Sequence, residues 1–425
     1  LGKTLQVLAL LLRRAPNGPA LVVAPMSVCQ GWVNEAARFT PSLRLLRWTA
    51  LDRTAKLAEL APFDVLVCSY GVMQNEIDAL SHINFETIVV DEAQAIKNVG
   101  AQRTKAARRL RGRFRIATSG TPIENHLGEL WSIMSFTNPG LLGSRQRFDD
   151  RFARRISIDH DALAADQLRR LVAPFLLRRL KRDVLSELPA KTEITLSIEL
   201  GEEERALYEG IRQKALRAIA QPGAAGVQRL RVLAELMRLR RAACHPELVA
   251  PGSGITSSKL TALKTLVEEL REGGHKALVF SQFVDHLEQV RRWLEEDKID
   301  HQYLVGATPE KERARAIEAF QSGQGDLFLI SLKAGGFGLN LTAADYVVIL
   351  DPWWNPAAED QAADRAHRIG QQRPVTVYRL VARATVEERI VALHEKKRNL
   401  ADSLLEGMSE AVPLEIDELR ELFEE

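Results

Sequence analysis

The sequence predicts an α/β protein of the doubly wound parallel-sheet kind, in which one arrangement of strands and helices occurs twice. The first observation is a series of short Val-, Ile- and Leu-rich runs without polar alternation, typical of strands buried on both faces of a parallel sheet. The second is that helical stretches, such as 259–272 and 285–296, lie between these runs. The third is the length, because 425 residues exceed what one core supports and indicate two to three domains.

The apolar runs divide into two sets of four, and each set predicts one sheet. We expect the first α/β lobe over residues 1–137 and the second over residues 259–383. The predicted strands are 20–24, 64–68, 87–90 and 115–118 in the first lobe, and 276–280, 327–330, 346–350 and 376–380 in the second.

The sequence predicts mainly helix in the remaining segments. Residues 138–258 show few strand signals and many helical ones, so we expect helical insertions there and a linker into the second lobe. Ser257 or Ser258 is a plausible N-cap for the helix that begins near residue 259. The charged, amphipathic residues 384–425 predict helices that pack across the lobes as a brace.

Composition excludes several classes of protein and leaves the partner open. The 58 basic and 56 acidic residues leave a net charge of only +2, so any surface for nucleic acid must come from local clusters such as 178–182 or 238–241. No apolar run is long enough to span a membrane, and no signal peptide is visible. We therefore expect no membrane partner and a cytoplasmic protein.

The three cysteines, Cys29, Cys68 and Cys244, are scattered and form no C-x-x-C pair. They indicate neither a disulfide framework nor a zinc site. Cys244 is followed by His245, but no second pair of this kind exists in the sequence, so we expect a structural role for both.

An acidic pair, Asp91 and Glu92, follows the apolar run 88–90. A strand that ends in two acids places them at the carboxyl edge of a sheet, where ligands bind in open α/β folds. Asp91 is suited to hold Mg²⁺ through water, and Glu92 to deprotonate an attacking water. An exposed acidic turn is the alternative. The next strand ends in Thr118 and Ser119, whose hydroxyl groups can hydrogen-bond the acids.

The chain opens with Gly2-Lys3-Thr4, the second half of a phosphate-binding P-loop, G-x-x-x-x-G-K-[ST]. Lys3 would meet the phosphates, and the Thr4 hydroxyl would share a Mg²⁺ ion with Asp91. The first glycine of the loop and the strand that leads into it would precede residue 1. We therefore expect the chain to be a fragment whose native start has been removed.

Two arginines, Arg365 and Arg368, lie three residues apart and are expected on one face of a short helix within 361–371. Their guanidinium groups present donors in a fixed fork that suits phosphate oxygens, so both are candidate arginine fingers from the second lobe. The alternative is a solvated charged face. The glycine-rich run 331–340, which follows a strand, could bring backbone close to a ligand or form a plain loop.

Taken in order, these segments resemble the SWI/SNF family of ATP-dependent DNA translocases, within the superfamily-two helicase class. Trp353-Trp354-Asn355-Pro356 and the run 361–371 separate this family from other helicase groups. The compact core indicates a bacterial source, and the resemblance then implies a nucleoid-associated protein. The matching segments are 1–6, 23–27, 68–71, 91–94, 119–125, 177–184, 188–191, 279–283, 306–313, 331–340, 351–356 and 361–371, with Trp32 and Glu35 besides.

The resemblance implies two RecA-like lobes, ATP and Mg²⁺ as cofactors, and a role for each matching residue. Glu92, Arg365 and Arg368 would be catalytic, and Thr4 and Asp91 would hold the metal. The family usually has histidine at the position of Gln94, which still donates and accepts hydrogen bonds. The implied nucleotide-binding residues are Gly2, Lys3, Thr4, Asp91, Gln94, Gly338 and Gln361. The implied DNA-side residues are Pro25, Ser27, Ser69, Tyr70, Ser281, Gln282, Ser331, Lys333 and Gly335.

The implied function is DNA-stimulated ATP hydrolysis that drives translocation along duplex DNA and remodels or displaces bound protein. Duplex DNA would be held through its backbone phosphates, which position without specifying sequence. The protein target, for example RNA polymerase, cannot be read from the chain, and we expect a monomer. Two alternatives are a strand-separating DNA or RNA helicase and a non-catalytic clamp that binds DNA or a polymerase. Trp353 and Trp354 could stack on a base, but packing against their lobe is the preferred interpretation.

Overall fold

The structure is a computed structural model in two compact units, one within Leu1–Ser186 and one within Glu187–Arg398. Each is described by itself. The described residues are 2–48, 57, 59–119, 127–159, 161–177, 179, 188–220, 225–335 and 340–393.

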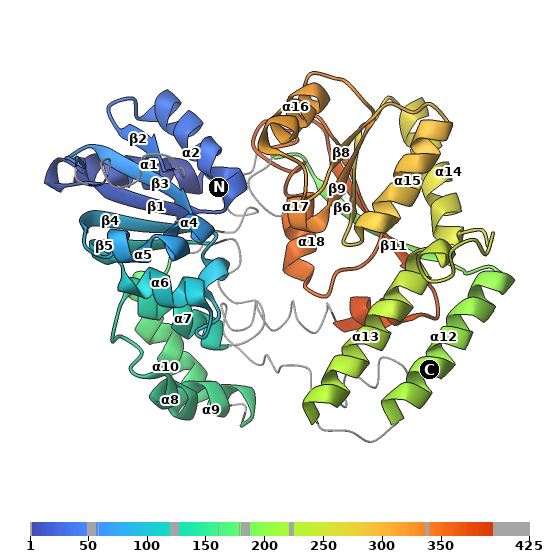
Figure 1. Cartoon of the computed structure of the whole chain (residues 1–425), viewed down its shortest axis with the longest axis horizontal. Helices are drawn as coiled ribbons and strands as arrows, with labels where there is room; N and C mark the ends of the chain where they lie inside the picture. Colours follow the sequence, from blue (N-terminus) through green and yellow to red (C-terminus); the bar gives the residue numbers. More distant parts are fainter. Residues whose placement is uncertain are drawn as a thin grey trace. The chain divides into compact units, whose positions relative to one another are not determined.

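The first unit is built on a five-stranded parallel sheet with the order β2-β3-β1-β4-β5 (Figure 1). Its strands are β1 (Ala20–Ala24), β2 (Arg44–Arg47), β3 (Asp64–Ser69), β4 (Asn84–Asp91) and β5 (Arg111–Thr118). The helices are α1 (Lys3–Arg14), α2 (Met26–Phe39), α4 (Tyr70–Asn75), α5 (Ile77–Leu80), α6 (Gln102–Arg109) and α7 (Leu127–Thr137), with 3₁₀ turns η1 (Ala15–Asn17) and η2 (Ala93–Ile96).

Successive residues of the central strand β1 enter two separate cores, because side chains alternate across a strand. Val22 and Ala24 pack with Trp32 on the face covered by α1 and α2. Leu21 and Val23 pack on the opposite face. Helices therefore cover both faces of the sheet, which explains why the central strands are apolar without alternation.

Helix α1 runs antiparallel to the strands of this sheet. At its C-terminal end, Arg14 hydrogen-bonds Thr87 Oγ1 at 3.1 Å and the Glu86 carboxylate at 2.5 Å, near the start of β4. The 12-residue helix spans about 18 Å. Its N-terminus, Gly2 to Thr4, consequently lies toward the carboxyl edge, where β4 ends at Asp91.

A smaller helical subdomain follows the first sheet. Its core joins Trp131 of α7 to Phe148, Phe152 and Leu168. Its elements are α8 (Arg145–Phe148), the π-helical turn η3 (Asp149–Ala153), α9 (Arg154–Ser157), α10 (Ala162–Val172) and η4 (Ala173–Phe175).

The second unit contains a six-stranded parallel sheet with the order β6-β11-β10-β7-β9-β8. Its strands are β6 (Lys191–Ile198), β7 (Ala277–Ser281), β8 (His301–Leu304), β9 (Leu327–Ser331), β10 (Tyr346–Ile349) and β11 (Val375–Ala382). The helices are α12 (Glu202–Ala220), α13 (Ala225–Cys244), α14 (Ser258–Glu272), α15 (Val284–Glu296), α16 (Glu310–Gln321), α17 (Leu332–Gly335) and α18 (Pro356–Ala363), with the 3₁₀ turn η5 (Pro246–Leu248).

This sheet also buries both faces, since Phe280 and Val279 of β7 enter different cores. Helices α12 and α13 form a hairpin whose core includes Val386 and Ile390, in a helical segment at 386–393. Ser257 is the N-cap of α14, and its side chain accepts a hydrogen bond from Leu260 N.

The predicted fold class is confirmed, as two parallel-sheet α/β lobes with helices. All eight predicted strands are present: β1 has the predicted ends, and the other seven differ at one or both ends. The prediction missed β2, β6 and β8. The strand β6 lies inside the segment expected to be helical, and it joins the second sheet by pairing with β11. The proposed brace falls mostly outside the described residues. No helix in the described part of the chain has the length and apolar character needed to cross a membrane.

Candidate functional site

The carboxyl edge of the first sheet brings together the ends of β1, β3, β4 and β5, since all four strands are parallel. At its centre is the Asp91 carboxylate, which is buried. Oδ1 accepts hydrogen bonds from Thr118 Oγ1 at 2.5 Å and from Glu92 N at 3.0 Å. Oδ2 accepts one from Trp32 Nε1 at 3.0 Å. Among the described residues, three donors thus fix the carboxylate, and about one of its four acceptor positions is left.

Glu92 follows in a left-handed backbone conformation, with φ 51° and ψ 57°. For a residue other than glycine this costs roughly 1–2 kcal/mol, and such strain gathers at functional sites. Its carboxylate Oε2 accepts a hydrogen bond from Gln94 Nε2 at 2.8 Å, and Gln94 Oε1 accepts one from Ser119 Oγ at 2.9 Å. The predicted bonding of strand-end hydroxyls to the acidic pair is confirmed for Thr118. Ser119 instead bonds Gln94, which in turn bonds Glu92.

Tyr70, at the end of β3, joins the same edge. Its hydroxyl donates to the backbone oxygen of Asp91 at 2.7 Å. Burial, with the negative charges of Asp91 and Glu92, raises the pKa of the Tyr70 phenol well above its usual value. The group is therefore a neutral donor. Neighbouring Ser69 caps α4, where its Oγ accepts from Val72 N at 3.2 Å.

The start of α1 supplies backbone donors near this edge. Gly2 has φ 64°, in the left-handed region that favours glycine, and it caps the helix. The first intrahelical bond runs from Gln6 N to Gly2 O at 3.0 Å, so the N–H groups of Lys3 and Thr4 have no intrahelical acceptor. Such helix starts bind phosphate, because exposed N–H groups and the helix dipole favour negative charge.

The other first-lobe candidates are less informative. Pro25 is the N-cap residue of α2 at the end of β1. Ser27 lies in the first turn of that helix, and its side chain is outside the described set. Glu124 and Asn125, which the resemblance included, also lie outside the described residues.

In the second lobe, one expectation about the arginines is wrong. Helix α18 ends at Ala363, so Arg365 and Arg368 lie in the turns after it and not on one helix face. After the helix, the Arg365 backbone oxygen accepts a hydrogen bond from Leu341 N at 3.0 Å. The backbone here therefore bonds the segment before β10 and does not continue the helix. Arg365 is 3% exposed, whereas Arg368 is half-buried.

Gln371 holds the arginine segment in place, a role that the sequence did not reveal. Its Nε2 donates to the backbone oxygens of Ala344 at 2.7 Å and Ala366 at 3.1 Å, and its Oε1 accepts from Arg373 N at 3.0 Å. The His367 ring adds a hydrogen bond of 2.9 Å from its Nε2 to Pro189 O. Both arginines thus lie in a segment that several hydrogen bonds attach to the second lobe.

The predicted DNA-side residues of this lobe follow β7 and β9. Ser281 and Ser331 are buried, and their hydroxyls bond within the lobe, to Asp351 and to Ala334 N respectively. Gln282 is half-buried, and its Nε2 has no hydrogen-bond partner among the described residues. Among the described side chains of this group, Gln282 is therefore the one with a donor available for a ligand.

The rest of this group is only partly described. Gln361 lies half-buried in α18. Lys333 and Gly335 belong to α17, without described side chains, and Gly338 lies outside the described residues.

The two tryptophans of the second lobe pack against it. Trp353 lies against the core that contains Phe280, and Trp354 against the core of the α12–α13 hairpin. The backbone N–H of Trp353 also donates to the buried Glu359 carboxylate at 2.6 Å, which pairs with Arg379 at 2.8 Å. The preferred interpretation, packing that fixes the loop, is confirmed.

Comparison with known families gives two matches that together cover most of the chain. The profile of the SNF2-related domain matches residues 1–248. The profile of the helicase conserved C-terminal domain matches residues 258–370.

Curated relatives match along the whole chain. A Bacillus subtilis (strain 168) protein named putative ATP-dependent helicase/translocase YwqA is 38% identical over 441 residues, covering 100% of this chain and 47% of that protein. The human SWI/SNF-related matrix-associated actin-dependent regulator of chromatin subfamily A member 1 is 37% identical over 431 residues, covering 95% of this chain and 41% of that protein. The chain spans less than half the length of these relatives.

A solved structure titled "Sulfolobus solfataricus SWI2/SNF2 ATPase core in complex with dsDNA" is 34% identical and covers 100% of this chain and 91% of that chain. Its TM-score is 0.46, too low to support a structural conclusion.

Proposed function

This chain belongs to the SNF2-related family, and we propose that it couples DNA-stimulated ATP hydrolysis to translocation along duplex DNA. The observation that supports this most strongly is the hydrogen-bonded Asp91 carboxylate at the carboxyl edge of the first sheet. Open α/β folds bind ligands at this edge. The start of α1 lies toward the same edge and offers backbone N–H groups for phosphate.

The residues at this edge fit Mg²⁺ and ATP. Asp91 keeps about one acceptor position for a water of the metal, and the Thr4 hydroxyl is a hard oxygen ligand of the kind Mg²⁺ prefers. Bound Mg²⁺ would neutralise charge on the β- and γ-phosphates. Lys3 would place its ammonium group on the same phosphates.

Glu92 would act as the general base. Its backbone is fixed by the left-handed conformation, and Gln94 holds one carboxylate oxygen at 2.8 Å. The other oxygen is then free to turn toward an attacking water and accept its proton. Because Gln94 also bonds Ser119, a shift of the loop after β5 would change the orientation of the base.

Arg365 and Arg368 of the second lobe would stabilise charge on the γ-phosphoryl group in the transition state. Fingers of this kind are worth roughly 10³–10⁵ in rate in other nucleotide hydrolases. The Gln371 network supports this role, because a finger must be held in one geometry to act. Gln361, one turn earlier in α18, would lie near the nucleotide.

DNA binding would use the strand-end residues of both lobes. Pro25, Ser69 and Tyr70 in the first lobe and Gln282 in the second would contact backbone phosphates, which carry no sequence information. The Tyr70 hydroxyl donates to the Asp91 backbone oxygen. A phosphate contact that moves Ser69 or Tyr70 would therefore shift Asp91 at the nucleotide site. This short path would account for stimulation by DNA.

The finer proposal is that translocation displaces or remodels a DNA-bound protein. A triplex-displacement assay tests movement along duplex DNA: the protein should release a third strand when ATP is present. Separation of a forked duplex without triplex release would instead favour a strand-separating helicase. ATP-independent DNA binding with neither activity would favour the non-catalytic clamp.

A further inference from the structure

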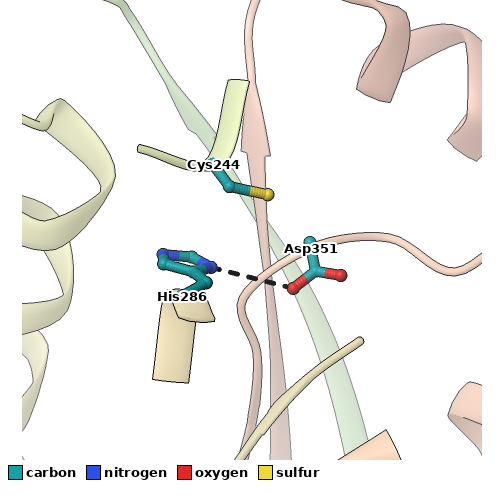
Figure 2. A group of neighbouring side chains, drawn as sticks. All are labelled: Cys244, His286 and Asp351. Atoms are coloured by element: carbon teal, nitrogen blue, oxygen red, sulfur yellow. Dashed lines mark ion pairs between the residues drawn. The ribbon is translucent and has the colours of Figure 1, made fainter. Parts of the chain in front are cut away.

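Three potential metal ligands converge in the second lobe, apart from the residues assigned above. Cys244 ends α13, His286 lies in the first turn of α15, and Asp351 follows β10. One ligand atom from each lies within 4.8 Å of the other two. The three residues are 0%, 1% and 1% exposed, and Figure 2 shows their side chains pointing toward one another.

The imidazole of His286 supplies an independent observation. Its Nδ1 is buried and has no hydrogen-bond partner among the described residues. It faces Asp351 Oδ1 at 3.9 Å, which is too long for a hydrogen bond (Figure 2). Buried polar atoms without partners are rare, and an ion is one of the few things that accounts for them. A cation beside the carboxylate would accept the nitrogen lone pair.

The geometry points to a Zn²⁺ site formed by Cys244, His286 and Asp351. Zinc takes this mixture of sulfur, nitrogen and oxygen ligands, whereas Mg²⁺ and Ca²⁺ take oxygen ligands. Three atoms no more than 4.8 Å apart surround a point at most roughly 2.8 Å from each. Zinc–ligand distances are about 2.0–2.3 Å, so each side chain needs to move inward by at most about 0.5–0.8 Å.

The surroundings of Asp351 are organised as in known metal sites, where hydrogen bonds orient the ligating groups. Asp351 accepts a hydrogen bond from Gln282 N at 3.2 Å and another from the Ser281 hydroxyl. The backbone oxygen of Cys244 accepts one from Ser257 Oγ at 3.4 Å. The carboxylate is therefore held from outside and directed inward. The Cys244 Sγ donates to Glu387 Oε1 at 3.8 Å, and it would give up this bond on binding the ion.

The charges also fit a divalent ion. On binding, the Cys244 thiol would lose its proton to solvent, and the resulting thiolate and the Asp351 carboxylate would together balance two positive charges. His286 would bind as a neutral imidazole. A buried ion compensated in this way avoids the large cost of an unpaired charge. Because the ligands are buried, the ion would enter as the lobe folds and would stabilise it.

A zinc ion at this site would cross-link three parts of the second lobe. Zinc would join the end of the α12–α13 hairpin, the start of α15 and the loop that precedes α18. Ser281 and Gln282 bond the same carboxylate, so the ion would stiffen a predicted DNA-side segment. The ligands are far apart in the sequence, which is why cysteine spacing alone gave no sign of a zinc site.

Cobalt spectroscopy tests the site in protein that is unfolded with a chelator, freed of it and refolded with Co²⁺, because Co²⁺ replaces Zn²⁺ and reports thiolate ligation. One equivalent of Co²⁺ should produce a thiolate-to-cobalt charge-transfer band that Zn²⁺ bleaches. Cys244→Ser should abolish the band and weaken metal affinity roughly 10-fold or more. Cys68→Ser, which changes a buried cysteine of the first lobe, is the matched control and should keep both.

His286→Gln is a second variant, in case Cys244→Ser does not fold. It should lower metal affinity by a similar factor, while His301→Gln in β8 should not. Zinc should raise the thermal midpoint of the wild type and of both controls. A cobalt spectrum without a thiolate band, or a band that survives Cys244→Ser, would overturn the proposal. Equal metal affinity in wild type and His286→Gln would do the same.

Discussion

The indole Nε1 of Trp32 donates a hydrogen bond of 3.0 Å to Asp91 Oδ2, joining α2 to the end of β4. Trp32 is 1% exposed, so this bond forms in a buried setting where a hydrogen bond to a charged group is strong. It fixes the rotation of the carboxylate together with Thr118 on the other oxygen. The candidate metal ligand is therefore oriented before any ligand binds.

Trp32→Phe should raise the Mg²⁺ concentration needed for half-maximal ATP hydrolysis, because the carboxylate loses one of its restraints. The protein should also lose about 1.5–3 kcal/mol of unfolding free energy, the usual value of a hydrogen bond to a charged group. Magnesium titration of the hydrolysis rate and chemical denaturation measure the two effects.

Trp48→Phe is the matched control, because Trp48 Nε1 is buried without a hydrogen-bond partner among the described residues. It should leave the magnesium dependence unchanged. The same shift in both variants would mean that packing, and not the bond to Asp91, is responsible.

Glu92→Gln should keep ATP affinity while hydrolysis falls roughly 10²–10⁴-fold, since the amide cannot accept the proton of the attacking water. Equilibrium nucleotide binding and steady-state turnover measure the two quantities. Glu86→Gln, at the other end of β4, should leave the chemistry intact. Retained turnover in Glu92→Gln would remove Glu92 as the base.

Gln94→Ala removes the hydrogen bonds that connect Ser119 to Glu92. We expect it to reduce the stimulation of hydrolysis by DNA more than the basal hydrolysis rate. The ratio of DNA-stimulated to basal hydrolysis should fall about 5–150-fold, the usual range of an allosteric coupling. Gln94→His, which introduces the residue usual in the family, should restore most of it. Loss of basal and stimulated rates by the same factor would argue against a coupling role.

Arg368→Ala should lower kcat by roughly 10³–10⁵ while ATP affinity changes only a few-fold, as expected of a group that acts on the transition state. Arg365 is 3% exposed, so its substitution also tests stability. Arg365→Lys keeps the charge but loses the forked donors, and it should lower kcat without unfolding the lobe.

Arg373→Ala is the control for the arginine variants, because Arg373 pairs with Asp345 at 3.3 Å and its side chain is largely exposed. It should change neither parameter. Equal losses of binding and rate in Arg368→Ala would assign that arginine to ground-state binding.

The second lobe also contains a buried ion pair, Lys259 Nζ to Glu387 Oε1 at 2.6 Å, with both side chains 1% exposed. Lys259 also donates to Leu350 O at 2.8 Å, so it links α14, the end of β10 and the segment after β11. Burial acts to lower the pKa of Lys259, but the charge and hydrogen bond of Glu387, together with the nearby Cys244 and Asp351, outweigh it and the pKa is raised. A raised lysine pKa stabilises the fold below the unfolded-state value, so the contribution is fully present at neutral pH.

Lys259→Met should cost about 3–5 kcal/mol of unfolding free energy, because it leaves the Glu387 charge buried without a partner. The double variant Lys259→Met/Glu387→Gln should recover much of this loss, since glutamine is neutral and still accepts from Ala382 N. Chemical denaturation of the wild type, Lys259→Met, Glu387→Gln and the double variant completes a double-mutant cycle. Additive losses would show that the pair contributes no interaction energy.

The strands that sequence reasoning missed, β2, β6 and β8, all lie at sheet edges. Arg44–Arg47 and His301–Leu304 are short and partly polar, and Lys191–Ile198 alternates exposed and half-buried residues. An edge strand lacks one neighbour, so it needs no continuous apolar run and resembles a loop or an amphipathic segment. The central strands were found because burial on both faces leaves an unbroken apolar signal. The edge strand β5 was predicted only in part, over 115–118 of Arg111–Thr118.

The candidate site also contains features that the sequence predicted and features that it did not. The sequence identified Asp91, Glu92 and the hydroxyls after β5, because strand ends of one parallel sheet meet at one edge. It did not reveal the bond from Trp32 to Asp91 or the Gln371 network, which join residues distant in the chain. A buried tryptophan needs an acceptor for its N–H, but the sequence does not say which one.

Steady-state ATP hydrolysis by the full-length protein, with and without duplex DNA, tests the central claim most directly. The account predicts stimulation of at least about 10-fold by duplex DNA, within the range of known couplings. Glu92→Gln should abolish the stimulated rate. Absence of hydrolysis under both conditions, with DNA binding intact, would contradict the motor and favour a non-catalytic clamp.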